Sequence, residues 1–127
     1  MKVLMFQERF VPRVESGDKR HTIRRAPVNP VKPGDELSLR CWSGKAYRSK
    51  QRTLRQEVCS KVETIQITET GAFLDEWELN PDQCEGLAVA DGFASFNEMQ
   101  DWHRTAHGLP FAGVLISWVP TPNGART

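Results

Sequence analysis

Residues 14–25 read Val14-Glu15-Ser16-Gly17-Asp18-Lys19-Arg20-His21-Thr22-Ile23-Arg24-Arg25. Gly17 can adopt a positive φ without a Cβ clash, so it permits a tight reversal of the chain. If the residues after this turn are extended, successive side chains point to opposite faces of a strand. Residues 19–25 contain five cationic or titratable side chains and therefore have no apolar face. Such side chains are almost never fully buried unless they are paired, so this strand either lines a solvated pocket with anionic contents or forms a basic surface.

Alternating and apolar segments on both sides of this stretch predict a sheet. We expect residues 57–68 to pair in antiparallel fashion with residues 36–42, because both alternate between apolar and polar side chains. A single helical turn is predicted at residues 10–14, with Gly17 as the residue that ends it. The segments that fit strands are residues 1–6, 19–25, 36–42, 57–68 and 113–119.

Two short helices are predicted late in the chain. Asn80 suits the N-cap of the first helix, with Pro81 at its first helical position, and Gly92 breaks this helix. Ser95 suits the N-cap of the second helix, because Glu98 follows at the capping-box spacing. The second helix is expected to end near residues 107–108.

The remaining segments are a basic loop or excursion from the sheet at 43–55, a strand end or helical turn at 70–79, and a frayed tail at 120–127. A chain of 127 residues without a repeat or linker predicts one domain spanning residues 1–127. We predict an α+β fold whose strands form a small mixed β-barrel, with the short helices packed at its side. The residues expected to close its core are Leu37, Leu39, Val62, Ile65, Leu115 and Val119.

Charge is distributed unevenly along the chain. The 17 Lys and Arg residues nearly balance the 16 Asp and Glu residues, for a net charge of +1. However, cations dominate residues 9–55 and acids dominate residues 57–101. This separation suggests one surface that faces a polyanion.

Cysteine usage and hydropathy suggest a cytoplasmic protein with reduced thiols. The three cysteines are widely spaced and form no C-x-x-C pair. No segment approaches the ~20 apolar residues of a membrane span, so we expect no membrane partner. His103 and His107 are four residues apart, but no carboxylate completes a familiar metal motif there. We therefore expect no metal and no cofactor, and we expect the four tryptophans in the core.

Three segments together resemble the ASCH domain family. They are the pattern from Phe10 and Val14 through Gly17, Lys19, Thr22 and Arg24, the segment Lys32-Pro33-Gly34-Asp35-x-Leu37, and the segment Ala90-Asp91-Gly92-Phe93-x-Ser95-x-x-Glu98-Met99. The resemblance covers residues 3–119 and implies a PUA-like β-barrel fold. Some members of this family are linked to RNA binding, another resembles a ribonuclease, and a small bacterial branch is an amidohydrolase of N4-acetylcytidine and related nucleosides.

The resemblance also implies site residues. The lysine and threonine of the amidohydrolase branch fall on Lys19 and Thr22, with the same spacing of three residues. The glutamate of that branch falls on Asp91, where this chain carries a side chain that is one methylene shorter. A general acid or base must come within ~3 Å of its proton, so the position of Asp91 decides whether the activity is preserved.

The same residues suggest this chemistry without the family. A threonine hydroxyl is inert at its own pKa and needs a nearby base. Lys19 can be that base if burial or neighbouring cations lower its pKa, Asp91 could orient it or shuttle the proton, and Arg24 could hold a carbonyl oxygen or a phosphate. The alternative is an ordinary strand threonine, a solvated turn lysine and an acid at a helix end.

A second group of candidate binding residues lies in the basic segment 43–55. Tyr47 stands among cations there, a pattern that fits base stacking combined with phosphate contacts. The candidate ligand-binding residues are Arg24, His21, Tyr47, Lys45, Arg48, Lys50 and Arg52.

Two functions of different class follow. One is a PUA-like module that binds RNA or a nucleotide in a basic cleft. The other is a hydrolase that acts on a modified nucleoside, such as an N4-acylcytidine, or on RNA. Convergence of Lys19, Thr22 and Asp91 in one cleft favours the hydrolase, and an Asp91 that points away disfavours it. The sequence does not fix the ligand or the oligomeric state.

Overall fold

The computed structural model describes residues 1–121, and the predicted α+β class is confirmed within them. Of the tail predicted at 120–127, residues 122–127 lie outside this range. The described chain has three α-helices, which are α1 (Val11–Ser16), α2 (Pro81–Asp91) and α3 (Phe96–Ala106). Its strands are β1 (Lys2–Met5), β2 (His21–Arg24), β3 (Glu36–Trp42), β4 (Gln51–Ile67), β5 (Ala72–Leu74), β6 (Trp77–Glu78) and β7 (Phe111–Trp118).

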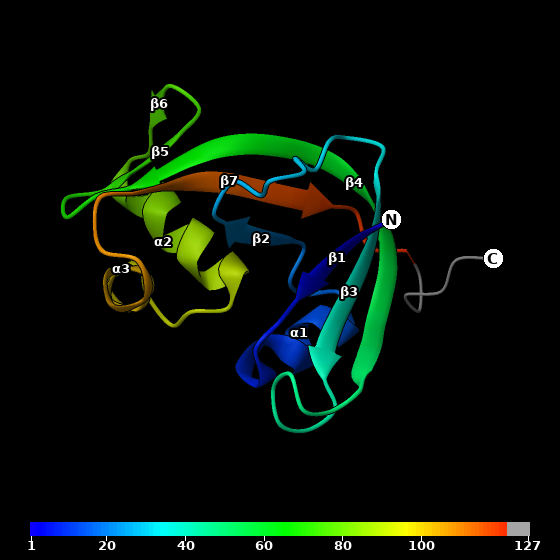
Figure 1. Cartoon of the computed structure of the whole chain (residues 1–127). Helices are drawn as coiled ribbons and strands as arrows, with labels where there is room; N and C mark the ends of the chain where they lie inside the picture. The colour runs from blue at the N-terminus through cyan, green and yellow to red at the C-terminus, as the bar shows by residue number, and fades with distance from the viewer. Residues whose placement is uncertain (122–127) are drawn as a thin grey trace.

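The sheet is built around β4, which is 17 residues long. The first half of β4 pairs with β3 and its second half pairs with β7 and β5, in each case antiparallel, as predicted for residues 36–42 and 57–68. β1 pairs parallel with β3, and β2 pairs antiparallel with β7. In Figure 1, β4 arches over the molecule, with α2 and α3 beneath one end and α1 near the other.

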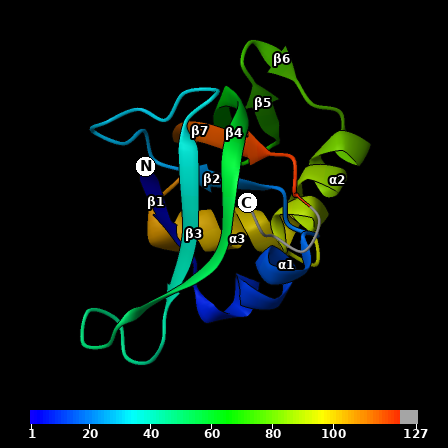
Figure 2. The ribbon, with the colours of Figure 1, turned by 90° about the vertical axis from the view of Figure 1, so that its right-hand side faces the viewer.

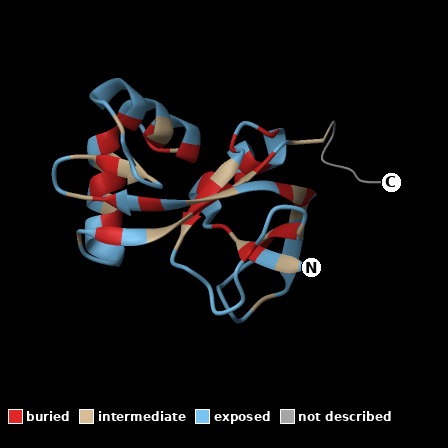
Figure 3. Cartoon of the chain, turned by 90° about the horizontal axis from the view of Figure 1, so that it is seen from above, coloured by how far each residue is buried: buried red, intermediate tan, exposed pale blue. Residues whose placement is uncertain are grey.

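The sheet is open between β1 and β2. Within residues 1–121 no ladder of backbone hydrogen bonds joins these two strands, so a closed barrel is not confirmed. Of the residues expected to close a barrel core, Leu37, Leu39, Ile65 and Leu115 are buried. Val62 is only partly buried and Val119 is 71% exposed, because Val119 lies beyond the end of β7. Buried residues follow the strands and the sides of α2 and α3 that face the sheet (Figure 3).

Several predicted boundaries were wrong. The strand predicted at 19–25 is confined to β2 (His21–Arg24), because the N–H of Lys19 still bonds to the main-chain oxygen of Arg13 in the turn after α1. β4 begins at Gln51, inside the segment predicted as a loop, because Gln51, Arg52 and Thr53 pair with the end of β3. The loop is therefore confined to 43–50, and it extends away from the body of the molecule in Figure 2. Residues 70–79, for which the sequence predicts either a strand end or a helical turn, contain the β5–β6 hairpin. At the C-terminal end, Thr121 is anchored by hydrogen bonds to the buried Glu57 carboxylate rather than frayed.

The helix ends are set by local residues, as predicted. Asn80 caps α2 through a complete capping box with Gln83, and Ser95 accepts a hydrogen bond from the Glu98 N–H at the start of α3. Gly17 ends α1 with a φ of 85° and Gly92 ends α2 with a φ of 105°, a region that strongly favours glycine. No helix of the described chain has the length and apolar character needed to cross a membrane.

Candidate functional site

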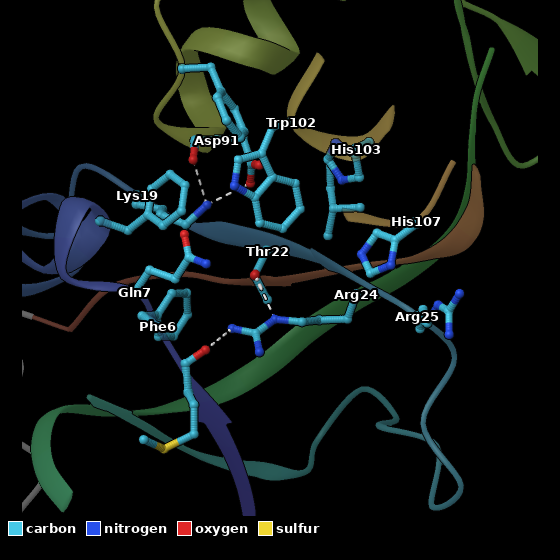
Figure 4. Close-up of a pocket in the computed structure, with 14 residues that line it drawn as sticks. Phe6, Gln7, Lys19, Thr22, Arg24, Arg25, Asp91, Trp102, His103 and His107 are labelled. Carbon is cyan, nitrogen blue, oxygen red and sulfur yellow. Dashed lines mark hydrogen bonds and ion pairs between the residues drawn. The ribbon is translucent and has the colours of Figure 1, made fainter. Parts of the chain in front are cut away.

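A cavity of about 320 Å³ lies between β2, the segment that follows β1, the end of α2, and α3. Its polar wall includes Lys19, Thr22, Arg24 and Asp91, so the structure brings the three predicted catalytic residues to one site. Figure 4 shows Thr22 between the Lys19–Asp91 contact on one side and Arg24 on the other. The predicted convergence of these residues is thus present, and Asp91 points into the group rather than away from it.

Lys19 is held by the end of α2. Its Nζ donates hydrogen bonds to Oδ1 of Asp91 at 2.6 Å and to the main-chain oxygen of Asp91 at 2.7 Å. The same Nζ lies 5.0 Å from the centre of the Phe10 ring. Lys19 is only 2% exposed, so it is neither a solvated turn lysine nor part of a basic surface. Its burial is tolerated because Asp91 pairs with it.

The backbone explains how Lys19 and Asp91 meet. Gly17 turns the chain out of α1, and the N–H of Lys19 then donates to the main-chain oxygen of Arg13 at 2.9 Å. Asp91 is the last residue of α2, and Gly92 follows with Phe10 packed against it. Two glycine-terminated helices therefore present their ends to each other, with the Lys19–Asp91 pair between them.

Burial shifts both members of this pair toward their neutral forms. It lowers the pKa of Lys19, although the Asp91 carboxylate opposes that shift. It raises the pKa of Asp91, although Lys19 opposes that shift in turn. A buried ion pair loses the solvation of both charges. Transfer of one proton from Lys19 to Asp91 removes both charges and leaves a lone pair on the lysine nitrogen.

Thr22 and Arg24 lie on the same face of β2, as the period of a strand requires. The Arg24 Nε donates to the Thr22 hydroxyl oxygen at 3.0 Å, and its Nη2 donates to the main-chain oxygen of Met5 at 2.6 Å. Burial lowers the pKa of Arg24 to about 10, so it stays charged at neutral pH. Its Nη1 makes no hydrogen bond within residues 1–121. Arg24 thus fixes the Thr22 hydroxyl and keeps a donor for a ligand.

His21 has a different place from the one predicted. It is not part of the cavity wall, and its Nε2 lies 3.4 Å from Oδ1 of Asp91. This nitrogen is buried and has no hydrogen-bond partner in the described chain. Burial, followed by the charge of Lys19, lowers the pKa of His21 to about 4. His21 is therefore neutral at pH 7, and its contact with Asp91 is not an ion pair.

Much of the remaining wall is aromatic. Phe6, Phe10, Phe93 and Trp102 line the cavity together with His103 and His107. Trp102 and the two histidines were expected to be core or surface residues, and only their position in space shows their part in the site. The sequence offered one signal for these residues, which is that His103 and His107 are one helical turn apart and so lie on the same side of α3. In the structure the ring centres of Trp102 and His103 are 4.9 Å apart. In the described residues no three His, Cys, Asp or Glu side chains are grouped to hold a metal ion.

The predicted basic loop does not contribute to this cavity. Lys45, Tyr47, Arg48 and Lys50 are exposed on the 43–50 loop. Arg52 lies on β4 and forms an ion pair with Glu15 at 3.1 Å, so it is less free to bind a phosphate than predicted. The ten predicted site residues thus fall into three groups. Four line the cavity, His21 lies behind it against Asp91, and the other five lie on the 43–50 loop or, for Arg52, on the adjoining start of β4.

Comparison of the chain with protein-family models, curated proteins and solved structures gave no match. The chemistry of the site itself therefore indicates its class. A buried lysine–carboxylate pair, a hydroxyl and an arginine donor lie against an aromatic wall. Such a constellation of titratable groups with shifted pKa values in one cavity is typical of a functional site.

Proposed function

We propose that the protein is an amidohydrolase that removes an acyl group from the exocyclic amine of a nucleobase, with Thr22 as nucleophile and Lys19 as base. The observation that carries this proposal is the convergence of Lys19, Thr22 and Asp91 in one cavity. The resemblance to the amidohydrolase branch of the ASCH domain family points to the same reaction. Each residue has a role that follows from its surroundings.

The first step needs a neutral Lys19. Burial shifts the Lys19–Asp91 pair toward the form in which Asp91 holds the proton and Lys19 is an amine, while the attraction between the two charges opposes this shift. That amine takes the proton of the Thr22 hydroxyl as Oγ1 attacks the carbonyl carbon of the substrate amide. The carbonyl oxygen becomes an oxyanion, and the free donor of Arg24 stabilises it.

The following steps return the site to its starting state. The Lys19 ammonium gives its proton to the departing amine of the base, the C–N bond breaks, and an ester on Thr22 remains. Water then attacks this ester while Lys19 accepts a proton from it, and the Thr22 oxygen is reprotonated as the carboxylic acid leaves. Asp91 keeps Lys19 in place and exchanges the proton with it.

The size and lining of the cavity support a nucleobase as the group that is bound. A volume of about 320 Å³ is at the lower end of typical ligand cavities, which suits one small heterocycle with its sugar. Phe6, Phe10 and Trp102 offer ring faces and edges for a planar base.

We also infer that the sheet is an opened PUA-like barrel. Five strands of mixed direction surround the core, and the remaining gap between β1 and β2 is crossed by the hydrogen bond from Arg24 to Met5 at 2.6 Å. The cavity is next to this gap, since Met5 of β1 and Thr22 and Arg24 of β2 all line it.

The test is hydrolysis of N4-acetylcytidine, followed by ultraviolet absorbance. Thr22→Ala should abolish turnover and Thr22→Ser should keep part of it, while Thr53→Ala, at an exposed position of β4, should match the parent. Lys19→Arg keeps the charge but cannot deprotonate at neutral pH, so it should lose turnover and still bind substrate. Because Lys19 is buried, Lys19→Met is measured beside Lys19→Arg, and thermal unfolding is recorded for both variants.

The rate of the parent should rise with pH, with an apparent pKa below the ~10.4 of a free lysine. Full activity in Lys19→Met would rule out the lysine as base.

A second candidate function is binding of RNA without chemistry, and the exposed cations and tyrosine of the 43–50 loop favour it. A parent that binds cytidine derivatives and RNA but hydrolyses no N-acylated nucleoside would support this candidate over the hydrolase.

A further inference from the structure

We propose that the protein acts on a nucleotide within a single strand, with the neighbouring nucleotide held in a second cavity beside Trp42 and Tyr47. This inference rests on the proposed function for the nature of the group in the first cavity. Its own support comes from the position of the second cavity, from its aromatic side chains and from the charges around it.

The two cavities are neighbours. The second has a volume of about 840 Å³, and residues 5–7 line both cavities. Phe6 and Gln7 can be followed at the edge of the first cavity in Figure 4. Beyond this shared segment the second cavity runs along the end of β3 and the 43–50 loop, where Trp42 and Tyr47 contribute to its wall. One nucleoside does not need both spaces, whereas two successive nucleotides of a strand would use both.

Trp42 and Tyr47 form an aromatic surface at the second cavity. Their ring centres lie 5.1 Å apart with an angle of 48° between the planes. Tyr47 is 88% exposed and has a φ of 62°, which is uncommon for a residue other than glycine. The loop thus holds a large ring in solvent at the edge of a cavity, and stacking of a base on such a ring stabilises single-strand complexes.

The charges around this surface fit phosphates. Lys45, Arg48 and Lys50 are exposed beside Tyr47, and within residues 1–121 none of them pairs with a carboxylate. The exposed Trp77 provides a contrast inside the same molecule. It is 79% exposed, but its neighbours are Asp75, Glu76 and Glu78, and it lines neither cavity. The wall of the second cavity itself holds Glu8 and the paired Arg52, so the free cations lie on the loop that carries Tyr47. Trp77 has no such cationic neighbours in sequence.

The test compares an oligonucleotide with a nucleoside. Fluorescence anisotropy is measured with a labelled single-stranded RNA of six nucleotides and with DNA of the same sequence, and N4-acetylcytidine binding is measured by calorimetry. Tyr47→Asn removes the ring and tolerates the positive φ, so it should weaken oligonucleotide binding about tenfold and leave nucleoside binding unchanged. Tyr47→Phe and Trp77→Ala should both match the parent.

Salt dependence tests the phosphate contacts. Replacing Lys45 and Arg48 together by alanine should reduce the slope of log affinity against log salt by about 1.4, or roughly 0.7 for each lost phosphate contact. The double variant Lys2→Ala/Lys61→Ala is the control, because Lys2 lies on β1 and Lys61 on β4, both outside the 43–50 loop. Preference for RNA over DNA would assign an RNA strand, and equal binding would assign any single strand.

The outcomes separate the two proposals. A parent that hydrolyses the nucleoside but does not bind either oligonucleotide, or an unchanged affinity in Tyr47→Asn, overturns the second cavity as a nucleotide site and leaves the hydrolase intact. Oligonucleotide binding that depends on Tyr47, together with failure to hydrolyse any N-acylated base, retains the second cavity and overturns the chemistry. Tight binding of an acidic peptide in place of nucleic acid also overturns the inference.

Discussion

At the scale of single residues, the buried Lys19–Asp91 pair should matter for stability as well as for function. Removing one member of such a pair leaves the other charge unpaired, which costs about 3–5 kcal/mol. We therefore expect Asp91→Asn to lower the free energy of unfolding by about that amount, as measured by urea denaturation. Arg104 pairs with Glu69 and Asp101 at the surface, where solvent screens the charges, so Arg104→Ala should cost much less. Equal losses in the two variants would contradict the described burial of the pair.

His21 should make the fold sensitive to acid. Its pKa is about 4 in the folded protein, against an ordinary value of 6.5, so between these pH values the unfolded chain binds the extra proton. Stability is therefore complete above pH 6.5 and falls as the pH drops toward 4, by roughly 3 kcal/mol in total. His21→Gln should remove this part of the pH dependence in urea titrations, whereas His107→Gln, at an exposed residue, should keep most of it. Parallel curves for the parent and His21→Gln would refute the expectation.

The candidate site shows how far the residues could be interpreted from the sequence. Lys19, Thr22 and Asp91 could be named together because the resemblance links positions that are about 70 residues apart in the chain. The burial of Lys19 could not be predicted, because a cationic stretch normally indicates solvent and the partner that permits burial comes from another element. His21 was misplaced for a related reason, since alternation in a strand does not tell which neighbour will cover each face.

At the scale of elements, the end of α2 controls the position of Asp91. A Cβ atom on Gly92 would lie 2.8 Å from Cδ1 of Phe10, and the φ of this residue is +105°. Gly34 has a φ of +95° but nothing lies within 4 Å of its added Cβ, which makes it a matched control. Gly34→Ala should cost ~1–2 kcal/mol for the backbone alone, and Gly92→Ala should cost more and reduce turnover. The measurements are urea denaturation and the hydrolysis assay; equal costs would show that the Phe10 contact relaxes freely.

The elements differ in how well the sequence predicted them. Residues 36–42 were predicted with the bounds that β3 has, because the strand is half-buried and alternates. The helices α2 and α3 were found from their caps. The start of β4 was missed because Gln51 to Thr53 carry no apolar alternation and become a strand only by pairing with β3. Arg55 was hard to place for a similar reason, because an arginine normally indicates an exposed position, whereas this one is buried in an ion pair with Glu57.

At the scale of the whole molecule, β4 joins the parts of the fold. It pairs with β3 near the loop and with β7 and β5 near the helices. We therefore expect one cooperative unfolding transition. Variants that retain only Trp42, at the end of β3, or only Trp102, on α3, should each show a single fluorescence transition in urea whose midpoint matches the circular dichroism midpoint of the same variant. A fluorescence midpoint that differs from the circular dichroism midpoint would show that one part unfolds independently of the other.

The gap between β1 and β2 has a consequence for the range of ligands that the protein accepts. A closed barrel has a circumference fixed by its strand number and stagger, whereas this sheet can widen or narrow along one seam. The hydrogen bond from Arg24 to the Met5 main-chain oxygen spans that seam, and the same side chain holds Thr22. Under the proposed amidohydrolase reaction, a bulky acyl group would be accommodated by spreading the seam, which would also draw Arg24 away from the Thr22 hydroxyl. A change that lets the seam open more easily would then admit larger acyl groups and, at the same time, lower the rate of hydrolysis of small ones.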